Sequence, residues 1–124
     1  MAQSLNVAKK HIVEYANSGW FYGHGVQQHF HHVLDALNIG YSSETDTPEF
    51  EREFQINRRD LEKGVEKLRA IDRGKEVDDV DVDDLAFSLD NSNISLTECI
   101  DCFNWLLNKS DKEHEKDWIF VSFF

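Results

Sequence analysis

The sequence predicts a small single-domain protein of the α+β class, with a helical N-terminal half and a short β-sheet that includes the C-terminal strand. The chain has 124 residues, of which 40% are hydrophobic and 30% charged. This size and composition are typical of one folded domain, so we expect residues 1–124 to share a single core. Apolar residues recur at helical spacing in several segments, whereas the C-terminal segment DWIFVSFF is apolar on both faces and rich in β-prone residues.

Two helices are predicted in the first 40 residues. The first has Ser4 as a candidate N-cap, Gly19 as a candidate C-terminal cap, and apolar positions at Leu5, Ala8, Ile12, Tyr15 and Ala16. The second ends before Gly40 and has its apolar stripe at Val26, Phe30, Val33, Leu34 and Leu37. The stretch GWFYGHG between them is predicted to be a turn that joins an antiparallel pair.

The middle of the chain contains one ambiguous segment and one clear helix. In SSETDTPEFEREFQI, Thr47 and Pro48 are typical of a helix start, but Phe50, Phe54 and Ile56 alternate as in a strand. We favour a strand over residues 47–56 that ends near Ile56. The following helix is predicted to begin after Asn57 and to stop at Gly74, with its buried stripe at Leu61, Val65, Leu68 and Ile71.

Residues 80–90 fit two structures equally well. Leu85, Phe87 and Leu89 alternate as in a strand, but Val82, Leu85, Ala86 and Leu89 also fit a short helix. Both interpretations stay open at this stage.

The last helix and the terminal strand are more clearly indicated. Ser95 and Glu98 form a capping-box pattern. The predicted core face of this helix is Leu96, Cys99, Ile100, Phe103, Leu106 and Leu107. The terminal strand is expected to be buried, either within the domain or under a partner.

Charge is the strongest functional feature of the sequence. The net charge is −11, and seven acidic residues lie between Glu76 and Asp90 with no Lys or Arg among them. Such a surface repels nucleic-acid phosphates and anionic membranes but attracts a basic protein. We therefore expect a basic, nucleic-acid-binding protein as partner, and no direct contact with nucleic acid or membrane.

Composition also indicates the compartment. No stretch approaches the roughly 20 apolar residues that a transmembrane helix needs. Two cysteines, Cys99 and Cys102, are too few and too close in sequence for a secreted disulfide framework. We expect a soluble cytoplasmic protein in which both are buried thiols.

A histidine-rich stretch, HGVQQHFHH, raises the alternative hypothesis of a metal-binding or hydrolytic enzyme. His29, His32 and Asp35 have a spacing that can place metal ligands on one helix face. However, the apolar stripe centres on Phe30, so His32 and Asp35 should face solvent while His29 and His31 lie on opposite flanks. A closed site would need His11 or Glu14 from elsewhere. We therefore predict a solvated or hydrogen-bonding histidine face, with no metal and no cofactor.

Two further patterns in the sequence are typical of other functions. The CIDC motif has the spacing of a redox motif. The first turn of a helix stabilises a thiolate, but Cys99 lies beyond that turn. A helix at 82–89, the turn DNSNI, a helix at 96–108 and a closing strand have the order of a winged helix, which makes a regulatory domain the third hypothesis. The would-be recognition helix has Glu98 and Asp101 and no cation before Lys109, which disfavours DNA readout.

The favoured hypothesis is a non-enzymatic acidic protein that inhibits a nuclease or another nucleic-acid-handling protein, in the manner of a DNA mimic. A toxin immunity protein and an anti-defence protein of a phage or mobile element, such as an anti-CRISPR protein, are examples. Trp105 is predicted to lie almost opposite the buried stripe, either as an interface anchor or buried by a neighbouring loop, of which the acidic run is one candidate. The candidate partner-binding residues are Glu76, Asp78, Asp79, Asp81, Asp83, Asp84, Glu98, Asp101 and Trp105. The sequence leaves the oligomeric state open.

Overall fold

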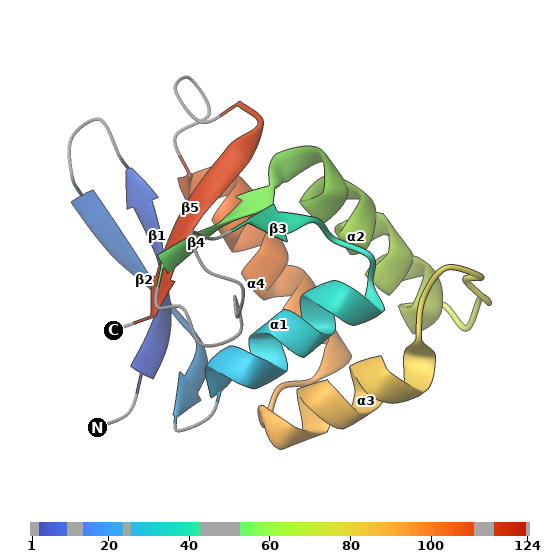
Figure 1. The fold of residues 1–124 in the computed structure, drawn as a ribbon. Coiled ribbons are helices and arrows are strands. Elements are labelled where there is room, and N and C mark those ends of the chain that lie inside the picture. Colours follow the sequence, from blue (N-terminus) through green and yellow to red (C-terminus); the bar gives the residue numbers. More distant parts are fainter. Residues whose placement is uncertain (1–2, 10–13, 24–25, 43–52, 111–115, 124) are drawn as a thin grey trace.

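The computed structural model describes residues 3–9, 14–23, 26–42, 53–110 and 116–123. In these ranges the chain forms five strands and four helices (Figure 1). Their order is β1 (Gln3–Lys9), β2 (Glu14–Gly23), α1 (Val26–Ala36), β3 (Tyr41–Ser42), β4 (Glu53–Asn57), α2 (Arg58–Asp72), α3 (Val82–Asn91), α4 (Leu96–Lys109) and β5 (Trp118–Phe123). The predicted α+β class is confirmed.

The strands form one antiparallel sheet in the order β2-β1-β5-β4-β3. The C-terminal strand, β5, therefore lies at the centre, and it pairs with β1 on one side and β4 on the other. This confirms the predicted terminal strand. Both neighbours of β5 come from the same chain: β4 pairs with residues 118–122 and β1 with residues 121–123.

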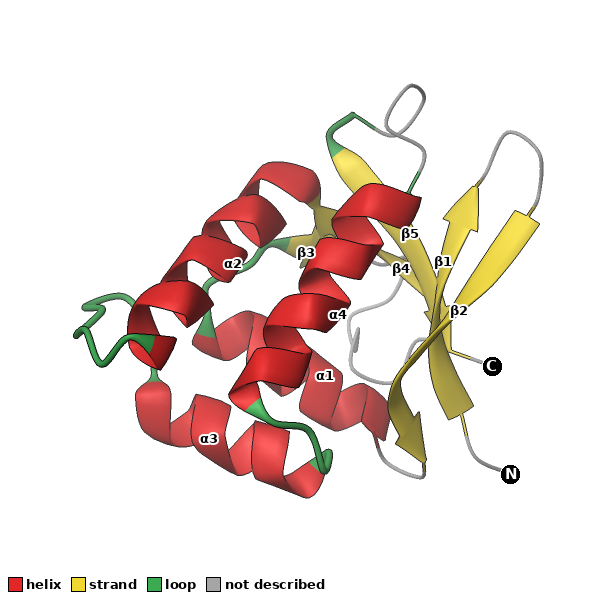
Figure 2. Ribbon diagram, turned by 180° about the vertical axis from the view of Figure 1, so that it is seen from behind, coloured by secondary structure: helices red, strands yellow, loops and turns green. Residues whose placement is uncertain are grey.

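The helices cover one side of the sheet, as the two opposite views show (Figures 1 and 2). Val7, Val121 and Phe54 form one cross-strand row that is buried beneath them. The opposite face carries Asn6 and Ser122, whose side chains are also buried, and Asn6 Nδ2 donates to the Ser122 carbonyl at 3.2 Å. Helices α1, α2 and α4 contact the sheet, and α3 packs on α1.

The helix predicted from Leu5 to Ala16 is wrong, because this segment supplies the antiparallel strands β1 and β2. Leu5 fits a helical spacing with Ala8 and a strand period with Val7, and the pairing of Leu5 and Val7 with Phe123 and Val121 of β5 decides for the strand. The predicted turn between two helices is also wrong, since Gly19–Gly23 belongs to the end of β2. Residues 10–13 and 24–25 lie outside the described ranges.

A bulge in β2 brings two consecutive aromatic residues against the helices. The β1–β2 register shifts between Ser4 and Asn6, and Phe21 has a φ of +51°. Neighbouring residues of a regular strand point to opposite faces, but a bulge with a left-handed residue changes this alternation. Phe21 contacts Phe30 of α1, and Trp20 contacts Trp105 of α4.

The aromatic core is centred on Phe30, which is fully buried in α1. Its ring lies 4.8 Å from Phe21, 5.6 Å from Phe123, 6.0 Å from Phe54 and 6.3 Å from Phe103, measured between ring centroids. Most of these contacts are edge to face, the arrangement that aromatic pairs favour. One side chain therefore joins α1 to three strands and to α4.

The helix boundaries agree with the predicted caps. The Asn57 side chain accepts a hydrogen bond from the Asp60 amide, and Gly74, with a φ of +78°, follows the end of α2. Ser95 and Glu98 form the predicted capping box of α4. The predicted apolar stripe of α1 is buried, and β4 confirms a strand that ends near Ile56. Residues 43–52, where the start of that strand was predicted, lie outside the described ranges.

A buried arginine ties the start of α2 to the end of α4. Arg58 is 9% exposed, and its guanidinium donates to the Leu107 carbonyl at 3.2 Å and to Ser110 Oγ at 2.6 Å. A buried cation is tolerated when oxygen acceptors replace its water shell, and these two groups supply part of that replacement. Within the described residues, no helix has both the length and the apolar character needed to cross a bilayer.

Close packing at Gly64 generates a first prediction. A Cβ atom added at this position of α2 would lie 2.5 Å from Ile39 Cδ1, well inside van der Waals contact. We expect Gly64→Ala to destabilise the fold by about 1–3 kcal/mol, as overpacking does, although alanine is favoured over glycine by about 1 kcal/mol in a helix interior. Urea unfolding gives the free energy.

The control uses Ile39→Val, which removes the clashing Cδ1 atom. In this background Gly64→Ala should destabilise the protein less than in the native chain, so the two changes should couple in a double-mutant cycle. An equal effect of Gly64→Ala in both backgrounds would show that the Ile39 contact is not its cause.

Candidate partner-binding surface

The structure resolves the ambiguity of residues 80–90 in favour of a helix. Helix α3 begins after Asp81, whose Oδ1 accepts a hydrogen bond from the Asp84 amide at 3.0 Å. Asp83 and Asp84 lie in the first turn, where the free amide groups and the helix dipole favour negative charge. The same acids that dominate the composition therefore also stabilise the helix start.

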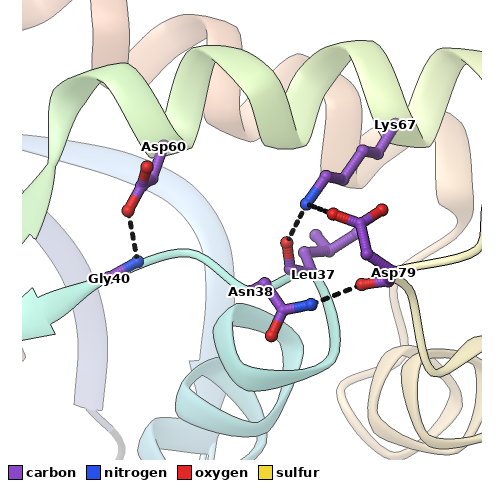
Figure 3. A network of polar contacts seen from close by, with 6 residues as sticks. All are labelled: Leu37, Asn38, Gly40, Asp60, Lys67 and Asp79. Carbon is purple, nitrogen blue, oxygen red and sulfur yellow. Dashed lines mark hydrogen bonds and ion pairs between the residues drawn. The ribbon is translucent and has the colours of Figure 1, made fainter.

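Figure 3 shows how the segment before α3 is fastened to the rest of the domain. Lys67 Nζ of α2 donates to the Leu37 carbonyl at 2.8 Å and forms an ion pair with Asp79 Oδ2 at 2.7 Å. Asn38 Nδ2 donates to the Asp79 carbonyl, and the Asp81 amide donates to the Ala36 carbonyl at 3.1 Å. The acidic segment is thus held against the end of α1.

The conformation of the chain after α1 supports this network. Asn38 has a φ of +57°, the left-handed conformation that asparagine tolerates at helix ends. Nearby, the Gly40 amide donates to Asp60 Oδ2 at 3.0 Å, and a Cβ atom at Gly40 would approach that oxygen to 2.9 Å (Figure 3). Side chains from α2 therefore fix both the end of α1 and the start of β3.

The ion pair changes the electrostatics of one acid. The hydrogen bond and positive charge of Lys67 hold the pKa of Asp79 below its ordinary value. Asp79 therefore stays ionised at neutral pH, but the adjacent ammonium partly cancels its charge. Its main role is to position the segment, whereas the other carboxylates produce the external field.

All eight predicted acidic site residues are exposed. Three of them have structural partners: Asp79 in the ion pair, Asp81 at the N-cap of α3, and Glu98 in the capping box of α4. The other five have no polar partner among the described residues and are free to face a ligand. They are Glu76, Asp78, Asp83, Asp84 and Asp101.

Phe87 is a surface residue that the sequence prediction missed. It is 62% exposed, and Val82 on the same helix is 46% exposed. Leu85 and Leu89 form the buried side of α3, and Phe87 lies about 200° around the helix from Leu85. A helical interpretation of residues 80–90 would have placed this ring on the outside.

Trp105 is half-buried and packs against the core, so it lies outside the fully buried stripe of α4. Its ring centroid is 6.4 Å from that of Trp20, at an interplanar angle of 67°. The ring that packs against Trp105 therefore comes from strand β2, whereas the sequence predicted coverage by a neighbouring loop such as the acidic run. This contact makes Trp105 a weaker candidate for an interface anchor than Phe87.

The histidines of α1 lie partly where the sequence indicated. His32 and Asp35 are exposed and His29 is half-buried, but His31 is fully buried. Its ring lies 4.3 Å from Phe54 and 4.8 Å from Tyr41, so His31 is buried among aromatic rings, whereas the sequence predicted a solvated or hydrogen-bonding histidine face.

The cause of this difference is the sheet, since β3 and β4 supply the rings that contact His31. Tyr41 of β3 also donates its hydroxyl to Asp35 Oδ1 at 2.9 Å. Among the described residues, no group of three His, Cys, Asp or Glu side chains could hold a metal ion. His11, a candidate donor, lies outside the described ranges.

The cysteines are buried, as predicted. Cys99 and Cys102 are both free thiols at 0% exposure, and burial raises the pKa of each well above its ordinary value. Cys102 therefore belongs to the buried side of α4, whereas Leu107, predicted for that side, is half-buried. Thiols in this state are poor nucleophiles.

The helix–turn–helix–strand order of the third hypothesis is present as α3, α4 and β5. However, β5 is the central strand of the sheet and not a peripheral wing. The exposed residues of α4 include Glu98 and Asp101, which would repel DNA phosphates.

Comparison of the chain with models of protein families, with curated protein sequences and with solved structures finds no match.

The network around Lys67 generates a second prediction. Lys67→Met removes both the ion pair to Asp79 and the hydrogen bond to the Leu37 carbonyl, so it should lower the free energy of unfolding by about 1–2 kcal/mol. It should also accelerate hydrogen exchange of the Asp81 amide, which bonds to Ala36. Lys63→Met, an exposed change on the same helix, is the control and should leave both quantities nearly unchanged. Equal effects of the two variants would contradict the proposed role of Lys67.

A third prediction concerns Trp105. Because its ring is half-buried against Trp20, Trp105→Ala should lower the free energy of unfolding by about 1–3 kcal/mol, less than the roughly 3–5 kcal/mol typical of a fully buried aromatic residue. Trp105→Leu and Trp20→Leu should couple in a double-mutant cycle by about 0.5–1.5 kcal/mol. If stability were unchanged while partner binding was lost, Trp105 would be an interface anchor after all.

Proposed function

We propose that this chain is a small acidic binding protein that inhibits a nuclease or another nucleic-acid-handling protein. The supporting observation is the surface of residues 76–90, on which all seven carboxylates are exposed and the backbone is fastened by Lys67, Asn38 and the cap of α3. Fixed carboxylates of this density resemble the charge of a nucleic-acid backbone more closely than a flexible acidic tail does.

The proposal follows from what such a surface attracts. Proteins that bind nucleic acids present grooves lined with Lys and Arg, and those grooves are complementary to any ordered polyanion. Long-range attraction accelerates association, and the fastened backbone reduces the ordering that binding requires. The chain would therefore compete with nucleic acid for a basic groove.

The classes of protein with this chemistry include immunity proteins against nuclease toxins and anti-defence proteins of phages or mobile elements. Both act by blocking a basic surface on a protein that cleaves or binds nucleic acid. The partner is expected to be a protein, because the same acidic surface repels nucleic acid and anionic lipid.

A fourth prediction tests the role of charge. The triple variant Asp78→Asn, Asp83→Asn and Asp84→Asn removes acids that have no side-chain partner among the described residues, so the fold should be retained. Asp79 and Asp81 are kept because they hold the segment in place. Association with the partner should slow by about tenfold or more and depend less steeply on salt, since steering by charge mainly sets the association rate.

The matched control removes three exposed acids from α2 by Glu62→Gln, Glu66→Gln and Asp72→Asn. Partners are first retained from an extract of the source organism on each immobilised variant, and the purified partner is then tested for nucleic-acid binding or cleavage. The proposal requires that the native chain suppress this activity and that only the first variant lose the effect. Equal loss in both variants, or no suppression, would refute it.

A further inference from the structure

We infer that the outer face of α3 is a docking surface for a cationic protein, with Phe87 inserting into an apolar pocket that Arg or Lys side chains surround. The α3 face is defined by Asp83, Asp84, Phe87, Asp90 and Asn91. This inference rests on the proposed function for the basic character of the partner. It goes further by naming the residue that anchors the contact and the pocket that receives it.

The exposure of Phe87 is the first observation. Leu85 and Leu89 already fill the buried side of α3, so Phe87 adds little to the core, yet 62% of its surface is in contact with solvent. Phe87 and Val82, which is 46% exposed elsewhere on α3, are the large apolar residues that are exposed in the described part of the chain. Large aromatic residues are enriched among the side chains that dominate binding energy.

The rigidity of its support is the second observation. The Asn91 side chain donates to the Phe87 carbonyl at 2.8 Å, and Ser92 Oγ donates to the Ser88 carbonyl at 2.8 Å. Asp81 caps the other end of α3, and its amide is bonded to Ala36 of α1. The ring is therefore presented on a fixed helix, which lowers the ordering cost of binding.

Charge identifies the occupant. Asp83 precedes Phe87 by one helical turn, Asp84 lies three residues before it, and Asp90 follows it by three, so carboxylates flank the ring on both ends. A purely apolar partner would bury these carboxylates without compensation. Arginine can pair with them through bidentate hydrogen bonds and can stack on an aromatic face.

The same charges disfavour the other occupants. A second copy docking through this face would bring two sets of like charges together. Nucleic acid and anionic lipid surfaces would be repelled. A cationic protein is the partner whose charge complements the carboxylates and whose surface can also offer a pocket for the ring.

The test begins by capturing the partner through Phe87 itself. Phe87 is replaced by the photoreactive amino acid p-benzoylphenylalanine in the full chain, and extract of the source organism is irradiated with it. The same replacement at Lys63, which is exposed on α2, is the control. The inference requires a protein that is cross-linked at position 87 and not at position 63.

The captured protein is then purified, and its affinity for the native chain and two variants is measured. Phe87→Ser should weaken binding by about tenfold or more, mainly through faster dissociation, while the salt dependence stays unchanged because no charge is removed. Phe87→Leu should restore most of the affinity, because it keeps an apolar side chain. Thermal unfolding of both variants should match that of the native chain.

Three results would overturn the inference: no cross-link specific to position 87, unchanged affinity of Phe87→Ser, or a homodimer that Phe87→Ser dissociates in sedimentation. The outcomes also separate this inference from the proposed function. A basic partner that has no role with nucleic acids would support the docking surface and refute the inhibitor. Inhibition that survives Phe87→Ser but is lost when the acids of residues 78–84 are replaced would support the inhibitor and refute the docking surface.

Discussion

The position of β5 at the centre of the sheet is the constraint on which the rest of the fold depends. This last strand needs a hydrogen-bonding neighbour on each side, and it finds them in β1 and β4. Its inward residues Val121 and Phe123 pair with Val7 and Leu5 of β1. The centre of the sheet therefore forms only when β1 and β5, which are far apart in sequence, come together. The helices then cover these rows, with Phe30 at the centre of the aromatic contacts. Both pairings of β5 therefore join residues distant in sequence, which is costly in loop-closure entropy and cooperative in outcome.

This dependence explains which elements were predictable. Helices α2 and α4 were found from Asn57 and from the Ser95–Glu98 pair, because a cap acts within one turn of its own helix. The N-terminal strand was not found, because Leu5 fits a strand with Val7 but also a helix with Ala8 and Ile12. The deciding contact is with β5, at the other end of the chain, and no local pattern reports it. The burial of His31 was missed for the same reason, since the covering rings come from β3 and β4.

The candidate surface was also only partly predictable from the sequence. Its charge could be predicted from composition alone, and the structure places all seven acids at exposed positions. The exposure of Phe87 could not be predicted, because in a strand this residue would share the inner face with Leu85 and Leu89. In a helix it lies on the opposite side. The Asp81 cap and the acids of the first turn decide for the helix. Whether Phe87 is buried or exposed therefore depends on whether residues 80–90 form a strand or a helix, and their hydrophobic pattern fits both.

In the acidic segment, some residues fasten the backbone to the domain and others only face solvent. Asp79, Asp81 and Lys67 are engaged within the domain, and the ion pair partly cancels one of the seven negative charges. Asp83 and Asp84 favour the first turn of α3, but their side chains and the remaining carboxylates have no internal partner among the described residues, and the mutual repulsion of these charges opposes folding. An exposed Phe87 likewise contributes little to stability. Phe87 and these carboxylates add neither packing nor internal hydrogen bonds, on a backbone that the side chains of Lys67 and Asn38 fasten, and stability alone would favour a less charged and less apolar surface; this is the pattern that the proposed interaction with a partner requires.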